Sequence, residues 1–177
     1  MESSELARFE AAVLPHLDAA YTLARYVTRN AHDAEDVVQD ACLRALRYFD
    51  TFHGEEGTSA RAWLLAIVRN TAYTWRRRRG GDALATEFDE TQHSHAVADD
   101  HPEEELLRSD AKETLGRALD RLAPEFREVI VLRELQGLSY KEISDVAGVP
   151  VGTVMSRLSR ARAHLQEALR EQGGGLT

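Results

Sequence analysis

Residues 149–165 read VPVGTVMSRLSRARAHL, a stretch with three arginines and no carboxylate in a chain whose formal net charge is −8. Guanidinium groups and hydroxyls are the side-chain groups that bind phosphates and the edges of bases, so a helix of this composition is suited to the major groove of DNA. An acid on such a helix would be repelled by the phosphates. The alternative interpretation is a basic surface helix that balances an acidic neighbour.

The elements around this stretch have the pattern of a helix-turn-helix. Ser139 and Glu142 form a capping-box pattern that starts a short helix to Ala147, and Gly148 stands where the turn needs a positive φ. The apolar residues that would face inward are Ile143, Val149, Val154 and Leu158. The exposed side of the second helix, which we expect to contact DNA, then carries Thr153, Ser156, Arg157, Ser159 and Arg160.

The acidity of the chain is concentrated in one segment. Residues 82–110 contain ten carboxylates and one arginine, a net charge of −9, which leaves +1 for the rest of the chain. A nucleic-acid partner is therefore compatible with the overall charge, because the local field of clustered side chains decides binding. The segment is polar and poor in large apolar residues, so we expect residues 81–105 to be a flexible linker.

Histidines and carboxylates in this linker raise the alternative of a metal-dependent enzyme, whose ligands would be His93, His95, Asp99, Asp100 and His101. A flexible segment offers no hydrogen bonds to orient such ligands, and no nucleophile or phosphate-binding loop accompanies them. We therefore expect no metal, no cofactor and no catalytic residue. The single cysteine, Cys42, excludes an internal disulfide.

The first part of the chain also has helical periodicity. Apolar residues within positions 6–27 recur at three- and four-residue steps, and Pro15 predicts either a kink or a break between two helices. Another helix is expected over residues 34–48, with Asn30 and Asp33 as candidate N-caps.

A loop with two glycines follows this helix, and Ser59 would cap the next helix, which ends in a run of four arginines before Gly80. Aromatic residues interleave with the loop and the basic run, a combination typical of proteins that stack unpaired bases while arginines bind the backbone. The alternative is that these rings pack in a core, which we favour for Phe49 and Trp63. For Phe52, beside the loop, we favour a binding role.

Because no segment has a strand pattern, the predicted fold is all-α. We expect two small helical domains, residues 1–80 and 106–177, joined by the acidic linker of residues 81–105, with the helix-turn-helix in the second domain. No apolar run is long enough to cross a bilayer, and the first residues lack the order of a signal peptide. We therefore expect a cytoplasmic protein without stable membrane insertion.

Two parts of the chain carry a family resemblance. The first reads HDAEDVVQDACLRALRYFDTF, followed by AWLLAIVRNTAYTWRRR; the second reads LDRLAPEFREVIVLRELQGLSYKEISDVAGVPVGTVMSRLSRARAHL. Both resemble the extracytoplasmic-function (group IV) sigma factors of bacterial RNA polymerase, in the order and spacing of that family. The resemblance implies that the first domain binds the polymerase and opens the minus-10 element of the promoter, while the second binds the minus-35 element as duplex.

The resemblance also implies site residues. Asp36, Gln39 and Asp40 match the face that docks on the beta-prime clamp coiled coil, and their spacing puts them on one side of a helix. The residues expected to bind the minus-10 element are Phe52, His53, Gly54, Asn70, Arg76, Arg77, Arg78 and Arg79. Those expected to bind the minus-35 element are Thr153, Ser156, Arg157, Ser159, Arg160 and Arg162.

Part of the first set belongs to a loop, residues 52–60, which matches the family's loop that captures a flipped minus-10 base. The contacts in such a pocket must offset the few kcal/mol of free energy that unstacking the base costs, so the pocket selects melted DNA. Three residues depart from the family pattern: Met155 and Ala66 stand where a basic residue is common, and Ser144 replaces alanine. Of these, Met155 removes an expected DNA contact.

Together these points predict an alternative sigma factor that binds core RNA polymerase, through the beta-prime clamp and the beta flap, and directs promoter-specific initiation. The resemblance implies a cognate anti-sigma factor and a stress or envelope response. The linker would permit a closed, inhibited chain and an extended, active one. The alternative is a stand-alone helix-turn-helix regulator, which would bind its duplex site specifically without polymerase.

Overall fold

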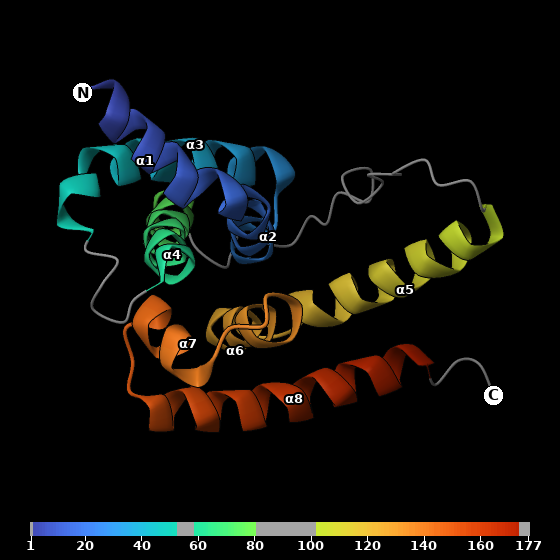
Figure 1. The fold of residues 1–177 in the computed structure, drawn as a ribbon. Coiled ribbons are helices and arrows are strands. Elements are labelled where there is room, and N and C mark those ends of the chain that lie inside the picture. The colour runs from blue at the N-terminus through green and yellow to red at the C-terminus, as the bar shows by residue number, and fades with distance from the viewer. Residues whose placement is uncertain (1, 53–58, 81–101, 174–177) are drawn as a thin grey trace.

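The computed structural model describes residues 2–52, 59–80 and 102–173, except for the side chains of residues 102–109. Every element within these ranges is helical, as predicted. The first unit contains α1 (Ser3–Val13), α2 (Leu17–Thr28), α3 (Ala31–Arg47) and α4 (Ala60–Arg78). Helices α2, α3 and α4 pack against one another, and α1 lies against α4 (Figure 1). Of the two alternatives predicted at Pro15, a kink or a break, the structure has the break, a short 3-10 turn, η1 (Leu14–His16).

Side-chain caps define where two of these helices begin. The Asp33 amide donates to Asn30 Oδ1 at 3.0 Å, so Asn30 is the cap of α3, and the helix starts three residues before the predicted position. The Ala62 amide donates to Ser59 Oγ at 3.0 Å, which confirms the predicted cap of α4. Between them lies a 3-10 turn, η2 (Phe49–Thr51).

The second unit consists of α5 (Pro102–Asp120), α6 (Pro124–Ile130), η5 (Val131–Leu135), α7 (Tyr140–Ala147) and α8 (Val151–Gly173). Helices α5, α6 and α7 pack on α8 (Figure 1). Helix α5 begins inside the predicted linker, at a proline followed by glutamates, a composition that favours a helix start. None of the helices in the described ranges is both long and apolar enough to cross a membrane.

Residues 124–135 form a regular α-helix only in their first part, α6. Segment η5 is a wide π turn, in which the Gln136 amide donates to the Val131 carbonyl at 3.0 Å, and Gly137 ends it with a φ of 68°. The next residue, Leu138, is fully buried, and its amide donates to the Leu132 carbonyl. The wide turn therefore directs the chain back into the core before α7 begins.

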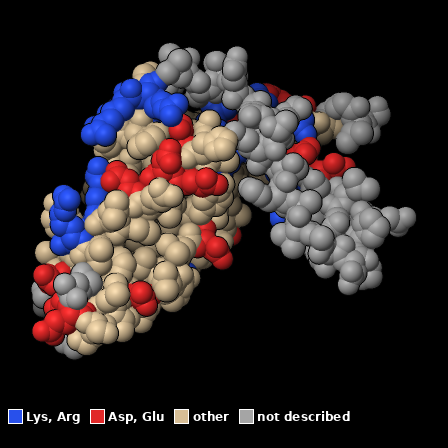
Figure 2. Space-filling model, turned by 90° about the horizontal axis from the view of Figure 1, so that it is seen from above, with Lys and Arg blue, Asp and Glu red and all other residues tan. Residues whose placement is uncertain are grey.

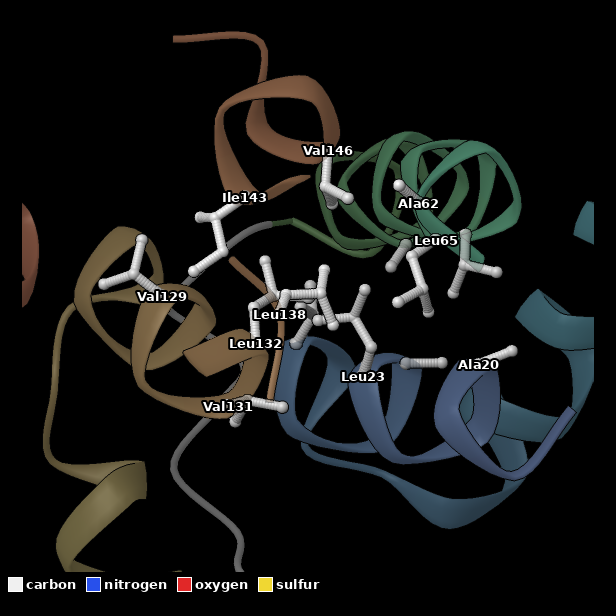
Figure 3. Close-up of a cluster of buried hydrophobic side chains, with 14 of the residues drawn as sticks. Ala20, Leu23, Ala62, Leu65, Val129, Val131, Leu132, Leu138, Ile143 and Val146 are labelled. Atoms are coloured by element: carbon white, nitrogen blue, oxygen red, sulfur yellow. The ribbon is translucent and has the colours of Figure 1, made fainter. Parts of the chain in front are cut away.

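A continuous apolar core joins the two units. Figure 3 shows side chains from α2, α4, α6, η5 and α7 pointing toward a common centre, among them Leu23, Leu65, Leu132 and Ile143. Helix α4 packs against α7, and α2 packs against α6. The sequence patterns predicted two helical domains and a linker that permits a closed chain, but they did not predict a shared core.

Candidate polymerase and nucleic-acid interfaces

The predicted helix-turn-helix is confirmed by its local geometry. The Glu142 amide donates to Ser139 Oγ and the Ser139 amide donates to Glu142 Oε1, each at 3.1 Å, so the capping box is complete. Gly148 has a φ of 69° in the turn, as expected. Ile143 of the first helix of the motif, α7, and Val154 and Leu158 of the second, α8, are buried, whereas Val149 is only half-buried.

The expected duplex-binding residues lie on the surface of α8. Ser156, Ser159 and Arg160 are exposed, and Thr153 and Arg157 are half-buried. Their spacing places Thr153, Ser156, Arg157 and Arg160 on one side of the helix. Arg162 is exposed too and donates to Glu134 Oε1 at 2.8 Å. Those four residues therefore share one side of α8, whereas the spacing puts Arg162 and the departing residue Met155, which is also exposed, on the other side.

The expected polymerase-docking face lies on α3. Asp36 and Gln39 are exposed, and Asp40 forms an ion pair with Arg44 at 3.3 Å, one turn along the helix. Leu43, which was not predicted from the sequence, is 67% exposed and lies three residues after Asp40, in line with the others. Figure 2, seen from above relative to Figure 1, shows one group of carboxylates across the middle of the surface and another at its lower left edge, with cations along the upper left edge.

Phe52, expected to bind a melted base, belongs to an aromatic cluster. Its ring lies 5.0 Å from that of Trp63 and 6.1 Å from that of Phe49. Phe49 is buried and touches Phe9 edge-on, so the core role favoured for Phe49 fits its position. Phe52 itself is half-buried. His53 and Gly54 lie outside the described residues.

The remaining residues of the expected minus-10 site follow α4. Asn70 is exposed and lines an open depression of about 400 Å³ whose other walls are Arg69, Tyr73, Thr74 and Arg77. Arg76 is half-buried, whereas Arg77, Arg78 and Arg79 are exposed at the end of the helix. Arg79 forms an ion pair with Asp33 at 3.0 Å, which ties the basic run to the start of α3.

Glu128 of α6 is buried where the two units meet. It is 0% exposed and accepts short hydrogen bonds from the Arg69 guanidinium and the Tyr73 hydroxyl, both on α4. Burial, and then the neighbouring Glu128 carboxylate, raise the pKa of Tyr73 well above its usual range, so the phenol remains a donor. A glutamate directly before the apolar run VIVL was a sequence signal for a buried carboxylate, although it did not specify the partners.

Two further ion pairs cross between the units. Arg29 Nε lies 3.3 Å from an Asp120 oxygen, and Arg61 Nη2 lies 3.4 Å from Glu142 Oε2. Ser59 also donates to Glu142, at 3.1 Å. Burial alone would raise the pKa of Glu142, but the hydrogen bonds from the Ser139 amide and the Ser59 hydroxyl, with the Arg61 charge, outweigh it, so the pKa of Glu142 is lowered.

Arg127 is a buried cation at the same junction. Its side chain is 2% exposed, its Nε has no hydrogen-bond partner, and one Nη donates to the Leu122 carbonyl at 3.5 Å. Burial, and then the nearby charge of Arg29, lower the pKa of Arg127 to about 10. The charge of Arg76 also lowers this pKa. The buried charge of Arg127, close to two other arginines, therefore opposes the packing of the two units.

The metal site considered in the linker lies outside the described residues. Within the described ranges, no three histidine, cysteine, aspartate or glutamate side chains are arranged to hold a metal ion.

Comparison with known proteins matches both units to one family. Residues 12–81 match the model of Sigma-70 region 2, and residues 112–165 match that of Sigma-70, region 4. The ECF RNA polymerase sigma-E factor of Haemophilus influenzae is 37% identical over 155 residues, which cover 83% of this chain and 79% of that protein. ECF RNA polymerase sigma factor SigE of Mycolicibacterium smegmatis is 38% identical over 160 residues, 89% of this chain but only 60% of the relative's length.

Solved structures agree with this match. The sigma factor RpoE of Bartonella quintana, crystallised with the anti-sigma factor NepR, superposes with a TM-score of 0.73 at 31% identity, over 92% of this chain and 97% of that one. CnrH in complex with the cytosolic domain of CnrY gives a TM-score of 0.63 at 29% identity, over 92% of this chain and 88% of the other. The chain belongs to the ECF family of RNA polymerase sigma factors.

Proposed function

We propose that this protein is an alternative sigma factor, which binds core RNA polymerase in the cytoplasm and directs initiation at its own set of promoters. The observation that carries this function is the match of both units, in order, to sigma regions 2 and 4. The protein would supply recognition and strand capture, while the polymerase supplies the chemistry, so no enzymatic activity is proposed for this chain.

The two units would divide promoter recognition between them. The stripe of hydroxyls and arginines on α8 is suited to the major groove, so residues 106–177 would bind the minus-35 element as duplex. Residues 1–80 would bind the minus-10 element after melting, with Asn70 and the arginines at the end of α4 near the captured strand. The exposure of Asn70 and of Arg77 to Arg79 supports this assignment.

The α3 face would dock on the beta-prime clamp coiled coil. Its polar residues, Asp36, Gln39 and Asp40, would give the contact its orientation, and Leu43 would supply apolar area at one end of it. A leucine that is 67% exposed gains stability when a partner removes it from water. We therefore add Leu43 to the docking residues expected from the sequence.

Promoter binding would require the two units to separate. The minus-10 and minus-35 elements lie about 25 base pairs apart, which is about 85 Å at about 3.4 Å per pair. Helix α8, with 23 residues, is only about 35 Å long. Because α8 is the longest helix in the described ranges, units that share one core span too short a distance to reach both elements. The closed chain would therefore be an inactive form.

An anti-sigma factor would hold this closed form. The likeness to the RpoE and NepR complex covers both units of this chain, so their relative placement resembles that of a sigma factor bound to its inhibitor. A protein that binds the closed form and not the open one shifts the population by mass action, without covering every functional surface.

The test is transcription in vitro with purified core polymerase and a library of genomic promoters. The protein should yield promoter-specific transcripts only with core enzyme, and Asp36→Ala with Gln39→Ala should abolish them. Glu10→Ala is the control, because Glu10 is an exposed acid of the same unit that lies on α1 and not on the docking helix. Specific duplex binding without polymerase, together with no core-dependent transcript, would instead support the stand-alone regulator.

A further inference from the structure

The ion pairs that cross between the described parts of the two units all have the same polarity. In each pair the first unit contributes an arginine and the second unit a carboxylate: Arg29 with Asp120, Arg61 with Glu142, and Arg69 with Glu128. Two of the three arginines, Arg61 and Arg69, lie on α4, the helix that carries Asn70. The second unit therefore presents negative charge to the basic side of the helix proposed to bind melted DNA.

The contact at Glu128 resembles the way a protein binds a phosphate. A guanidinium and a phenolic hydroxyl converge on one carboxylate, and these are donors that proteins also use for phosphate oxygens. The Arg69 guanidinium lies over the Tyr73 ring, 4.5 Å from its centre. An aromatic ring with an arginine beside it is the kind of platform on which unpaired bases stack.

The depression on α4 connects this contact to the proposed DNA site. Arg69 and Tyr73, which bind Glu128, also line the depression together with Asn70, Thr74 and Arg77. Its walls thus offer two guanidiniums, an amide, two hydroxyls and no carboxylate. This set of groups suits a single strand, whose backbone is anionic and whose bases present hydrogen-bonding edges.

We propose that Arg69 and Tyr73 belong to a single-stranded-DNA-binding surface on α4, and that Glu128 of α6 occupies this surface in the closed chain as an internal substitute for a phosphate. The proposal rests on the proposed function, since it assigns melted DNA to the first unit. Separation of the units would free both side chains. Closure would therefore inhibit the protein by competition for these donors, in addition to holding the units together.

The experiment measures binding of the full chain, without polymerase, to fluorescently labelled oligothymidylate by anisotropy. Small-angle scattering of the same samples reports whether the units separate. Glu128→Gln keeps the shape of the side chain and removes its charge. It should expand the chain and tighten oligothymidylate binding by about tenfold or more, because the apparent affinity scales with the fraction of open molecules.

Two controls make the result specific. Asp145→Asn removes an exposed carboxylate of the second unit that pairs only with Lys141 of its own helix among the described contacts, and it should leave both readouts unchanged. Arg69→Ala combined with Glu128→Gln should leave the chain expanded and abolish the tighter binding. Tyr73→Phe keeps the ring and removes one donor from both the Glu128 contact and the DNA-binding surface, so it should expand the chain less than Glu128→Gln does and should not tighten oligothymidylate binding.

Each failure has a distinct meaning. If Glu128→Gln expands the chain without tighter binding, or if the gain persists without Arg69, the surface assignment is wrong. If Glu128→Gln changes neither readout while its helical circular dichroism is that of the parent, Glu128 does not hold the units closed and the proposal fails. Because no polymerase is present, none of these outcomes changes the result of the transcription test.

Discussion

Replacement of Arg127 by methionine should stabilise the protein. The pKa of this side chain falls from 12.5 to about 10 in the folded chain. A difference of this size corresponds to about 3 kcal/mol, since one pKa unit is about 1.4 kcal/mol. This is the free energy by which burial and the neighbouring arginines disfavour the charged form. Methionine has a similar length and no charge, so it would remove this unfavourable contribution.

The expected gain is smaller than that figure. The substitution also loses the hydrogen bond to the Leu122 carbonyl, which at 3.5 Å is long and contributes about 0.5 to 1 kcal/mol. Imperfect packing of methionine costs a similar amount. The net effect should be a stabilisation of about 1 to 2 kcal/mol, which for a chain of this size raises Tm by about 2 to 8 °C.

Differential scanning calorimetry at pH 7 measures this effect. Arg117→Met is the matched control, because Arg117 is exposed and pairs only with Glu113 one turn away among the described contacts, so its Tm should hardly change. Arg127→Met should also weaken oligothymidylate binding, because the charges of Arg29 and Arg76 act on it only while the units are together. A fall of more than about 1 kcal/mol in the free energy of unfolding would refute the reasoning.

Three further predictions concern single features of the structure. Leu43→Asp should lower the affinity for core polymerase by about tenfold or more in a fluorescence binding assay, whereas Leu6→Asp, on the exposed side of α1, should not. Gly148→Ala should lower the free energy of unfolding by about 1 kcal/mol in thermal melts, because φ is 69° although the space around the new methyl group is open; Gly148→Asn should cost less. Because the pKa of Glu142 is lowered in the folded chain, its carboxylate stabilises the fold fully at pH values above the ordinary pKa of 4.5, and this stabilisation is lost as the pH falls through the pKa of the folded state. Glu142→Gln should therefore flatten the dependence of Tm on pH below about 5.

Features that depend on nearby residues could be predicted from the sequence. The caps at Ser59 and Ser139, and the turn at Gly148, follow from residue types three or four positions apart, and the structure has each of them. The inward-facing positions of the helix-turn-helix follow from helical periodicity in the same way. The cap of α3 was narrowed only to two candidates, because both Asn30 and Asp33 accept amide hydrogen bonds equally well.

Features that depend on distant residues could not be predicted. The contact of Glu128 with Arg69 and Tyr73 joins positions more than fifty apart, and nothing in the spacing of either segment specifies its partner. The same holds for the wide turn η5, whose residues have an ordinary helical pattern and whose shape depends on how Leu138 enters the core. Leu43 was missed because one exposed leucine on an amphipathic helix has no distinguishing pattern.

The placement of α3 and α8 bears on how such a protein is switched off. The two helices lie on opposite sides of the shared core (Figure 1), and the polar stripe of each faces outward while the two units are packed together. An inhibitor that binds across the boundary between the two units could therefore hold the chain closed without covering either stripe. The size of such an inhibitor would depend on the width of that boundary and not on the length of a promoter.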